Sequence, residues 1–132
     1  MPTPDVNTIT EKIIGCAYRV SNSLGIGFVE KVYKNAMAPD IHISGLKVAQ
    51  QAPIKVLYDG VVVGDFFADL LVEEKVLVEL KVVSMLNDEH VAQSLNYLRA
   101  TGLEICLLIY FGPPKVQLKR LRRSINWKMP NS

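Results

Sequence analysis

The sequence predicts an α/β fold in which helices flank a mixed β-sheet. Apolar residues recur at helical spacing through the first 45 residues, and the pattern then changes to the short apolar runs that are typical of strands. A second helical stretch, at about 87–100, precedes a nearly continuous apolar run. At 132 residues, 49% of them hydrophobic, the chain is long enough to bury one core. We therefore expect residues 1–132 to form a single domain.

The first helix is predicted by a capping signature and an apolar face. Thr8 and Glu11 form a capping box, and the apolar residues that follow at helical spacing extend the helix to about Ser23. Glycines at positions 25 and 27 then break it. A second helix is expected from about residue 28. Pro39 should end or kink that helix, because proline removes a backbone donor and clashes with the preceding turn.

The middle of the chain predicts a meander of strands. Short runs rich in β-branched residues alternate with turn residues, and Asp59-Gly60 is a strong hairpin signal between two of them. The expected strands cover Val48–Gln51, Ile54–Tyr58, Val61–Val63, Phe66–Val72 and Val76–Val82.

A helix and two strands are expected after the meander. The helix covers Asn87–Ala100, with Asn87 as its N-cap and Gly102 as its stop. Its crossing from the fifth strand to an apolar run at Ile105–Phe111 implies a parallel pair with a right-handed crossover. A last, basic strand is expected at Val116–Leu121, at an edge of the sheet.

Charge is distributed unevenly along the chain. The net charge is only +2, but no acidic residue follows Glu104. This asymmetry indicates either a contact with a polyanion or a solvated tail, at about 122–132, that keeps the protein in solution. The basic residues that follow Glu104 are Lys115, Lys119, Arg120, Arg122, Arg123 and Lys128.

The two cysteines and the apolar segments indicate a cytoplasmic protein. Cys16 and Cys106 lie in apolar runs without the spacing of a metal site, so we expect buried free thiols in a reducing compartment. The N-terminus lacks the pattern of a signal peptide, and the apolar runs are too short to span a bilayer.

Three charged residues stand in apolar strands and need a reason to be there. Glu79 and Lys81 share one face of a strand, and Asp69 lies between Ala68 and Leu70. An ion pair at a sheet edge would satisfy them, and so would a hard divalent cation held by the two carboxylates. From these residues alone the ion pair is favoured, because short charged motifs are common by chance.

The turn between the two strands tests the metal hypothesis. A two-residue turn at Glu73-Glu74 would place Asp69 and Glu79 on opposite faces of the sheet. A three-residue turn over residues 73–75 pairs Asp69 with Glu79 directly, with Cβ atoms roughly 5 Å apart. The metal hypothesis therefore requires an odd-length turn or a bulge.

Polar residues on two helices are candidates for the same site. His90, Gln93 and Tyr97 form a polar stripe distinct from the apolar face of their helix. The stripe suits either contact with a buried site or a partly exposed helix face. Glu30 and Tyr33, one turn apart, could reach the same cleft.

These features together resemble a known family. The stretch GFVEKVY at 27–33 matches the pattern that names the GxxExxY family, and the resemblance extends from about Ile13 to Arg120. It is also carried by GLKV at 45–48, ADLLV at 68–72, VELK at 78–81 and AQSLNYL at 92–98. The family is placed within the PD-(D/E)XK nuclease-like superfamily. The resemblance therefore implies a restriction-endonuclease-like fold.

The resemblance implies a metal site on the strands. Asp69 and Glu79 match the metal-binding acids of the superfamily, and Lys81 matches its catalytic lysine. The Leu80 carbonyl would join the two acids as a ligand of Mg²⁺ or Mn²⁺. Ala68 replaces the proline of the "PD" pattern.

The resemblance also implies roles for helical residues. Gln93 and Tyr97 resemble the Q-x-x-x-Y element of RecB-type nucleases, which supports the site. Glu30 resembles the first-helix acid of related nucleases. A literal Pro39-Asp40 lies at the expected end of the second helix, far from the hairpin, and is rejected as the motif.

Two functions remain open at this point. The first is magnesium-dependent hydrolysis of phosphodiester bonds, with DNA as the substrate. The second is a nucleic-acid-binding or protein-interaction module that keeps the nuclease fold without turnover. A homodimer through apolar parts of the helices would supply two sites. Phosphate contacts are expected from Lys119, Arg120, Arg122 and Arg123.

Overall fold

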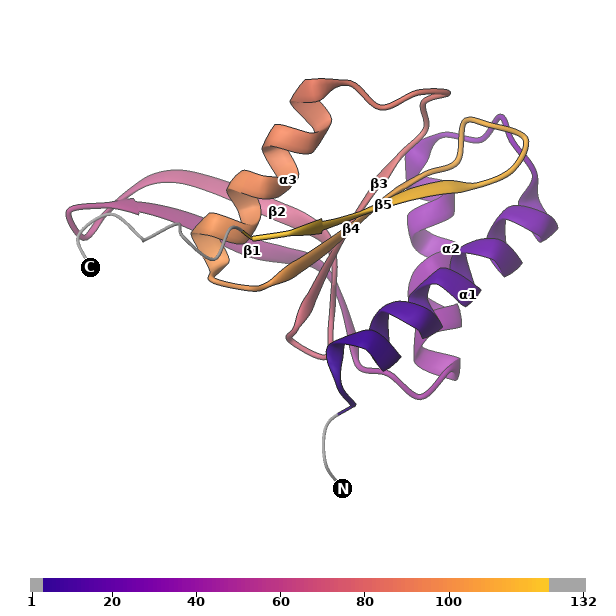
Figure 1. The fold of residues 1–132 in the computed structure, drawn as a ribbon, viewed down its shortest axis with the longest axis horizontal. Coiled ribbons are helices and arrows are strands. Elements are labelled where there is room, and N and C mark those ends of the chain that lie inside the picture. Colours follow the sequence, from indigo (N-terminus) through magenta and orange to yellow (C-terminus); the bar gives the residue numbers. More distant parts are fainter. Residues whose placement is uncertain (1–3, 124–132) are drawn as a thin grey trace.

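The fold is a five-stranded mixed sheet with helices on both faces (Figure 1). The computed structural model describes residues 4–123. Within that range the helices are α1 (Val6–Leu24), α2 (Glu30–Ile43) and α3 (Asp88–Thr101), and the strands are β1 (Val48–Tyr58), β2 (Val61–Val72), β3 (Val76–Lys81), β4 (Ile105–Tyr110) and β5 (Gln117–Arg122). The predicted fold class is confirmed.

The strands follow one another in the order β1-β2-β3-β4-β5. Only the pair β3–β4 is parallel, and α3 forms the connection between its strands, as the sequence predicted. The other neighbouring pairs are antiparallel. The basic strand β5 is one edge of the sheet, which confirms the expected edge position, and β1 is the other.

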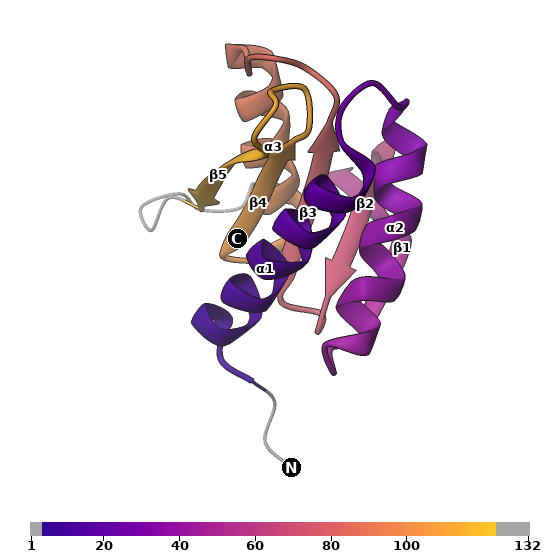
Figure 2. The ribbon, with the colours of Figure 1, turned by 90° about the vertical axis from the view of Figure 1, so that its right-hand side faces the viewer.

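Two apolar clusters fill the space between the sheet and its helices. The cluster beneath α1 and α2 includes Ile13, Met37 and Leu80, whereas the cluster beneath α3 includes Leu77 and Leu98. Figure 2 shows α1 and α2 side by side on one face of the sheet, with α3 on the other. The alternation along β3 therefore sends Leu80 to one helical layer and its neighbours Glu79 and Lys81 to the other.

The meander contains two long strands where the sequence predicted four short ones. β1 runs through Ala52 and Pro53, which lie in the gap between two of the predicted strands. Proline is tolerated because β1 is an edge strand, where a missing backbone donor leaves no ladder partner unsatisfied. The outer part of the β1–β2 hairpin, residues 53–67 and hereafter the arm, extends away from α1 and α2 (Figure 1).

Both N-terminal helices differ from the expected ones. Asp5, and not Thr8, is the N-cap of α1, and its carboxylate accepts the Thr8 N–H at 2.8 Å. In α2 the helix continues past Pro39 to Ile43. Pro39 and Asn35, whose carbonyl loses its helical partner, are both exposed, so that carbonyl is open to hydrogen bonding by solvent.

The remaining expectations concern cysteines, membrane spans and the tail. Cys16 and Cys106 are free and buried, as predicted. None of the helices within residues 4–123 is long and apolar enough to cross a membrane. Lys128 and most of the predicted basic tail, at 124–132, lie outside the described residues.

Candidate active site

The turn between β2 and β3 has the odd length that the metal hypothesis required. Val72 pairs with Val76 and Leu70 with Val78, so three residues, 73–75, form the turn. Glu73 and Glu74 take positive φ values of 53° and 54° to make it. Continuing the register by one residue places Asp69 opposite Glu79.

Asp69 and Glu79 are joined through the backbone of the opposite strand. The Asp69 N–H donates to Glu79 Oε2 at 2.7 Å, and the Leu80 N–H donates to Asp69 Oδ2 at 2.8 Å. The β2–β3 ladder ends at Leu70 and Val78, so these two hydrogen bonds replace the next rungs. Both carboxylates are thereby held where the two strands separate.

β2 changes faces at this point. Ala68 and Leu70 are two residues apart and would share a face in a regular strand. Ala68 instead packs in the α3 cluster and Leu70 in the cluster beneath α1 and α2. Opposite them in β1, Gln51 has a φ of 53°. Asp69 therefore stands where side chains from both helical layers can approach it.

Glu79 is the buried acid of the site. Its residue is 5% exposed, and burial, together with the nearby charge of Asp69, raises the pKa of Glu79 to about 8. The Asp69 N–H and the charge of Lys81 act in the opposite direction without overcoming burial. A buried carboxyl with this balance favours a proton, or a cation, beside it.

Lys34 of α2 is a site residue that sequence reasoning missed. Its Nζ lies 4.0 Å from Asp69 Oδ1, and both side chains are only 16% exposed. Lys34 follows Glu30 by one helical turn, so both side chains lie on the same side of α2. That spacing was the available signal.

Glu30 faces the same group of charges from the start of α2. Burial and then the negative charge of Asp69 raise the pKa of Glu30, whereas Lys81, Lys34 and His90 lower it. These influences place Glu30 electrostatically among the residues of β2, β3 and α3. The structure therefore brings the predicted first-helix acid within electrostatic range of Asp69 and Lys81.

The sequence suggested that Tyr33 could reach the same site as Glu30. In the structure it does not join these charged residues. It is fully buried, and its ring stacks on Phe111 with centroids 4.4 Å apart. Its hydroxyl donates to the Gly25 carbonyl at 2.8 Å and accepts the Phe28 N–H at 3.4 Å. Tyr33 thus fastens the loop between α1 and α2 and fixes where α2, and with it Glu30, begins.

The polar stripe of α3 divides into a cap and a site contact. His90 Nδ1 accepts the Asn87 N–H at 3.2 Å, so His90 completes the capping box of α3. Gln93 Nε2 donates to Tyr97 Oη at 3.0 Å. Burial and then the charge of Glu79 raise the pKa of Tyr97, so the phenol lies within electrostatic range of the acid.

The predicted phosphate-binding residues lie on two faces of β5. Lys119 pairs with Leu108, which pairs with Glu79, so Lys119 shares the face and row of the acid two strands away. Arg120 points to the other face and donates to Asn7 at 2.9 Å.

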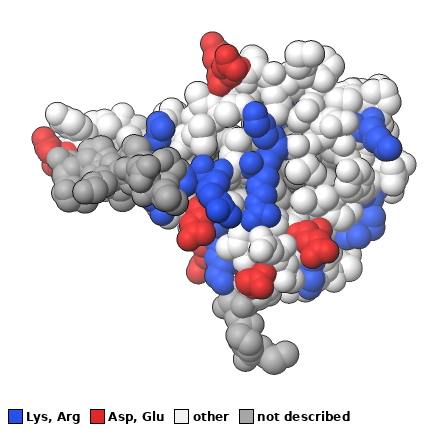
Figure 3. Space-filling view, in the orientation of Figure 1, with Lys and Arg blue, Asp and Glu red and all other residues white. Residues whose placement is uncertain are grey.

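Arg122 is the last residue of β5, and Arg123 follows it. Arg122 shares the face of Arg120, and Arg123 donates to the Leu103 carbonyl at 3.2 Å. Figure 3 shows Lys and Arg side chains gathered over β5. Among these four, Lys119 is the residue on the strand face that carries Glu79.

The donors fit a cation that takes part of its coordination from water. Within residues 4–123, no three His, Cys, Asp or Glu side chains gather as a complete metal-binding group. Mg²⁺ is commonly held by one or two carboxylates and keeps several waters for its substrate. Asp69 and Glu79, held together by backbone donors and with Glu79 buried, fit this mode of binding.

Solved structures with similar folds include two of LHK-Exo, an alkaline exonuclease from Laribacter hongkongensis. One matches with a TM-score of 0.55 and 17% identity over 93% of this chain and 73% of the exonuclease. The complex of LHK-Exo with dAMP matches with a TM-score of 0.56 and 17% identity over 89% and 69% of the two chains. The protein SSO0001 matches with a TM-score of 0.56 and 16% identity over 91% of this chain and 60% of its own. At these identities the likeness establishes the fold.

Sequence comparison establishes the family. No curated protein matches the chain. Residues 7–121 match the sequence profile of the PD-(D/E)XK nuclease superfamily, which covers every helix and strand except the first residue of α1 and the last of β5. This protein is therefore a member of the PD-(D/E)XK nuclease superfamily.

Proposed function

We propose that the protein is a divalent-metal-dependent nuclease that hydrolyses phosphodiester bonds in DNA. One observation carries the proposal: Asp69 and Glu79 are locked together through each other's strands, with Lys81 following on the same face. An ion pair alone does not account for this arrangement, because Glu79 is buried and its pKa is raised to about 8 despite Lys81.

Asp69, Glu79 and the Leu80 carbonyl would hold Mg²⁺ or Mn²⁺. Members of the superfamily typically use divalent metal ions. When bound, the ion supplies Lewis-acid catalysis at the phosphate. Two carboxylates and a main-chain oxygen suit a hard cation that also takes oxygen from its substrate.

The side chains of the protein supply the other functions. Lys81 orients the attacking water and carries positive charge beside the acids. Lys34 adds a positive charge and Glu30 a negative charge near Asp69. The charged groups of the site therefore come from α2 as well as from the strands. Gln93 holds Tyr97 by a hydrogen bond, and Tyr97 lies within electrostatic range of Glu79.

We also infer that the protein belongs to the GxxExxY branch of the superfamily, because the structure gives each motif residue a physical role. Gly27 has a φ of 108°, a conformation that favours glycine. Tyr33 fastens the loop that contains this glycine, and Glu30 begins α2 beside Asp69. Gly27 and Tyr33 of the motif therefore fix the position of Glu30.

Cleavage of labelled DNA with and without Mg²⁺ or Mn²⁺ tests the proposed function. Asp69→Asn and Lys81→Ala should each reduce cleavage at least about 100-fold. Glu74→Gln changes an exposed acid of the adjacent turn and should leave cleavage unchanged. Metal-dependent cleavage that survives Lys81→Ala would overturn the assignment of Lys81.

The alternative is a member that binds nucleic acid or a protein without cleaving. It is favoured by the lack of a third metal-binding side chain close to the acids within residues 4–123. In that case the wild-type protein would bind DNA in the same experiment, and no divalent ion would produce cleavage.

A further inference from the structure

Phe66 presents an aromatic ring at the border of the candidate site. It lies on β2 where the arm leaves the body of the sheet, and 43% of its surface is exposed. Its ring centroid is 5.7 Å from that of Tyr97, with an angle of 44° between the rings. The charge of Glu79 raises the pKa of Tyr97, so the Phe66 ring packs against a residue within electrostatic range of that acid.

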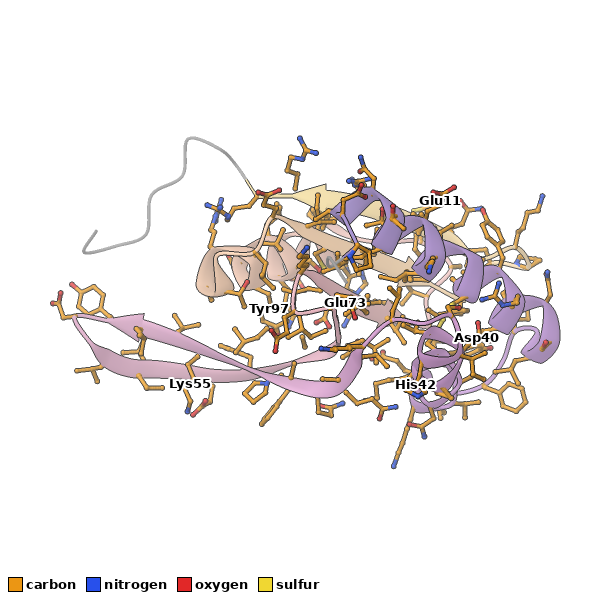
Figure 4. The ribbon with its side chains drawn as sticks, turned by 90° about the horizontal axis from the view of Figure 1, so that it is seen from below. Glu11, Asp40, His42, Lys55, Glu73 and Tyr97 are labelled. Atoms are coloured by element: carbon orange, nitrogen blue, oxygen red, sulfur yellow. The ribbon has the colours of Figure 1, made fainter. Side chains whose placement is uncertain are left out.

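The backbone makes room for this ring. Gly64 precedes Phe66 by two residues on the same face of β2. A Cβ at position 64 would come within 2.9 Å of Phe66 Cε2, which is closer than real side chains allow. Gly64 therefore lets the ring lie on the strand, and Tyr97 borders it, so its position is set before any ligand arrives. Figure 4 shows Tyr97 between α3 and the β1–β2 hairpin.

The surroundings of the ring suit a base better than a phosphate. Lys55 and Asp65 are the charged pair of this part of the arm, and they form an ion pair with each other at 3.3 Å. They lie one residue from Ile54 and Phe66, on the opposite face of the hairpin. On the face of Phe66 lie its cross-strand partner Ile54 and the ring of Tyr97. Covering the exposed half of this apolar ring would remove apolar surface from water, which is favourable.

We propose that Phe66 is a stacking platform for an unpaired nucleobase next to the scissile phosphate, so that the protein acts on single-stranded DNA or on frayed ends. This inference rests on the proposed function and narrows its substrate. Every base offers a π-face, and stacking on an aromatic side chain contributes about 1–3 kcal/mol per base. The bases inside a duplex are already stacked on their neighbours and cannot offer a face to Phe66.

Binding measured in EDTA tests the platform separately from cleavage. The full chain is titrated with a short single-stranded oligonucleotide containing 2-aminopurine, and with the matching duplex. Phe66→Ala should weaken single-strand binding about 10-fold, and it should abolish the quenching of 2-aminopurine. Duplex binding should change less than about 2-fold. Phe66→Trp should keep both single-strand signals.

Phe67→Ala is the matched control, because Phe67 is 56% exposed on the opposite face of the same strand. Gly64→Ala should reproduce the loss by displacing the ring while leaving it in the chain. Equal losses with Phe66→Ala and Phe67→Ala, or equal losses for single strand and duplex, would overturn the platform. Cleavage that fails while the Phe66 effect persists would count against the proposed function alone.

Discussion

At the level of one residue, the raised pKa of Glu79 makes the stability of the fold depend on pH. Its folded pKa of about 8 lies above its ordinary value, so the folded protein binds a proton more tightly than the unfolded chain does. The proton stabilises the fold fully below the unfolded pKa, and this stabilisation is lost as pH rises through 8. The ionised form that a metal needs is therefore the destabilised one.

The first prediction is that the metal-free protein loses stability between about pH 4.5 and 8 because of Glu79. Glu79→Gln should flatten this part of the profile and stabilise the protein at pH 8.5. The gain has an upper bound of about 5 kcal/mol, since one unit of pKa is worth about 1.4 kcal/mol. Urea denaturation across pH measures it.

Glu74→Gln serves as the control for this prediction, because Glu74 is exposed in the adjacent turn. Its pH profile should match that of the wild type. If Glu79→Gln retained the wild-type slope above pH 5, the buried acid would not be the source of the instability.

The second prediction concerns Lys34. It is the ion-pair partner of Asp69 and lowers the pKa of Glu30, so Lys34→Ala should leave two neighbouring acids less compensated. We expect kcat/KM for cleavage to fall about 10-fold or more, as for a charge held close to a reacting group. Lys31→Ala changes an exposed lysine of the same helix and should have no such effect. Equal activities of the two variants would remove Lys34 from the site.

Some site residues could be predicted from the sequence and others could not. Asp69 and Glu79 were recognisable because charges in apolar strands require a partner, and the odd turn needed to join them is present. Lys34 offered only its spacing of one helical turn from Glu30, and Phe66 offered no signal, because tertiary contacts bring both residues to the candidate site.

At the scale of elements, local rules predicted the strands and helices better than their ends. The strand patterns of the sequence located every strand of the sheet, although β1 and β2 were each predicted as two shorter strands. The gap expected between residues 51 and 54 was wrong. β1 is continuous there because an edge strand tolerates the missing backbone N–H of Pro53. Pro39 was expected to end or kink the second helix, and it does not end α2, because one lost helical bond on an exposed side is tolerated. Both errors arose from tertiary context.

The carboxyl ends of β3 and β4 are held together by a close backbone contact. The Phe111 N–H donates to the Lys81 carbonyl at 2.9 Å. One residue later, a Cβ on Gly112 would lie 2.0 Å from the Val83 carbonyl oxygen. Gly112 thus lets the loop that follows Lys81 cross the end of β4.

The third prediction is that Gly112→Ala displaces this loop. The variant should lose about 2 kcal/mol or more of stability through steric overlap, and cleavage should fall with it. Gly15→Ala is the matched control, because a Cβ there meets Arg19 at an ordinary 3.6 Å in the middle of α1. It should stabilise the fold by about 0.5–1 kcal/mol. Similar melting temperatures for both variants would contradict the tight contact.

At the scale of the whole molecule, exposed apolar surface is concentrated on the arm. Within residues 4–123, seven of thirteen exposed large apolar side chains belong to it. The predicted homodimer was expected to use apolar parts of the helices, and it stays a prediction. The sequence did not predict the arm, because alternation along a strand does not say how far a hairpin extends beyond its sheet.

The geometry of the sheet also determines which basic side chains lie on the same face as Glu79. The sequence grouped Lys119, Arg120, Arg122 and Arg123 by their closeness along the chain. Because alternate residues of a strand point to opposite faces, β5 separates them. Lys119 lies in the row of Glu79, whereas Arg122 points toward the layer of α1 and α2.

The last prediction is that these two residues contribute unequally to DNA binding. Each phosphate contact adds about 0.7 to the slope of log K against log salt for single strands. Lys119→Gln should therefore lower that slope by about 0.7, uniformly across sequences. Arg122→Gln removes an equally exposed charge from the other face and should leave the slope unchanged. Anisotropy titrations at several salt concentrations measure both. If Arg122→Gln had the larger effect, DNA would cross the α1 and α2 face of the sheet, away from Glu79.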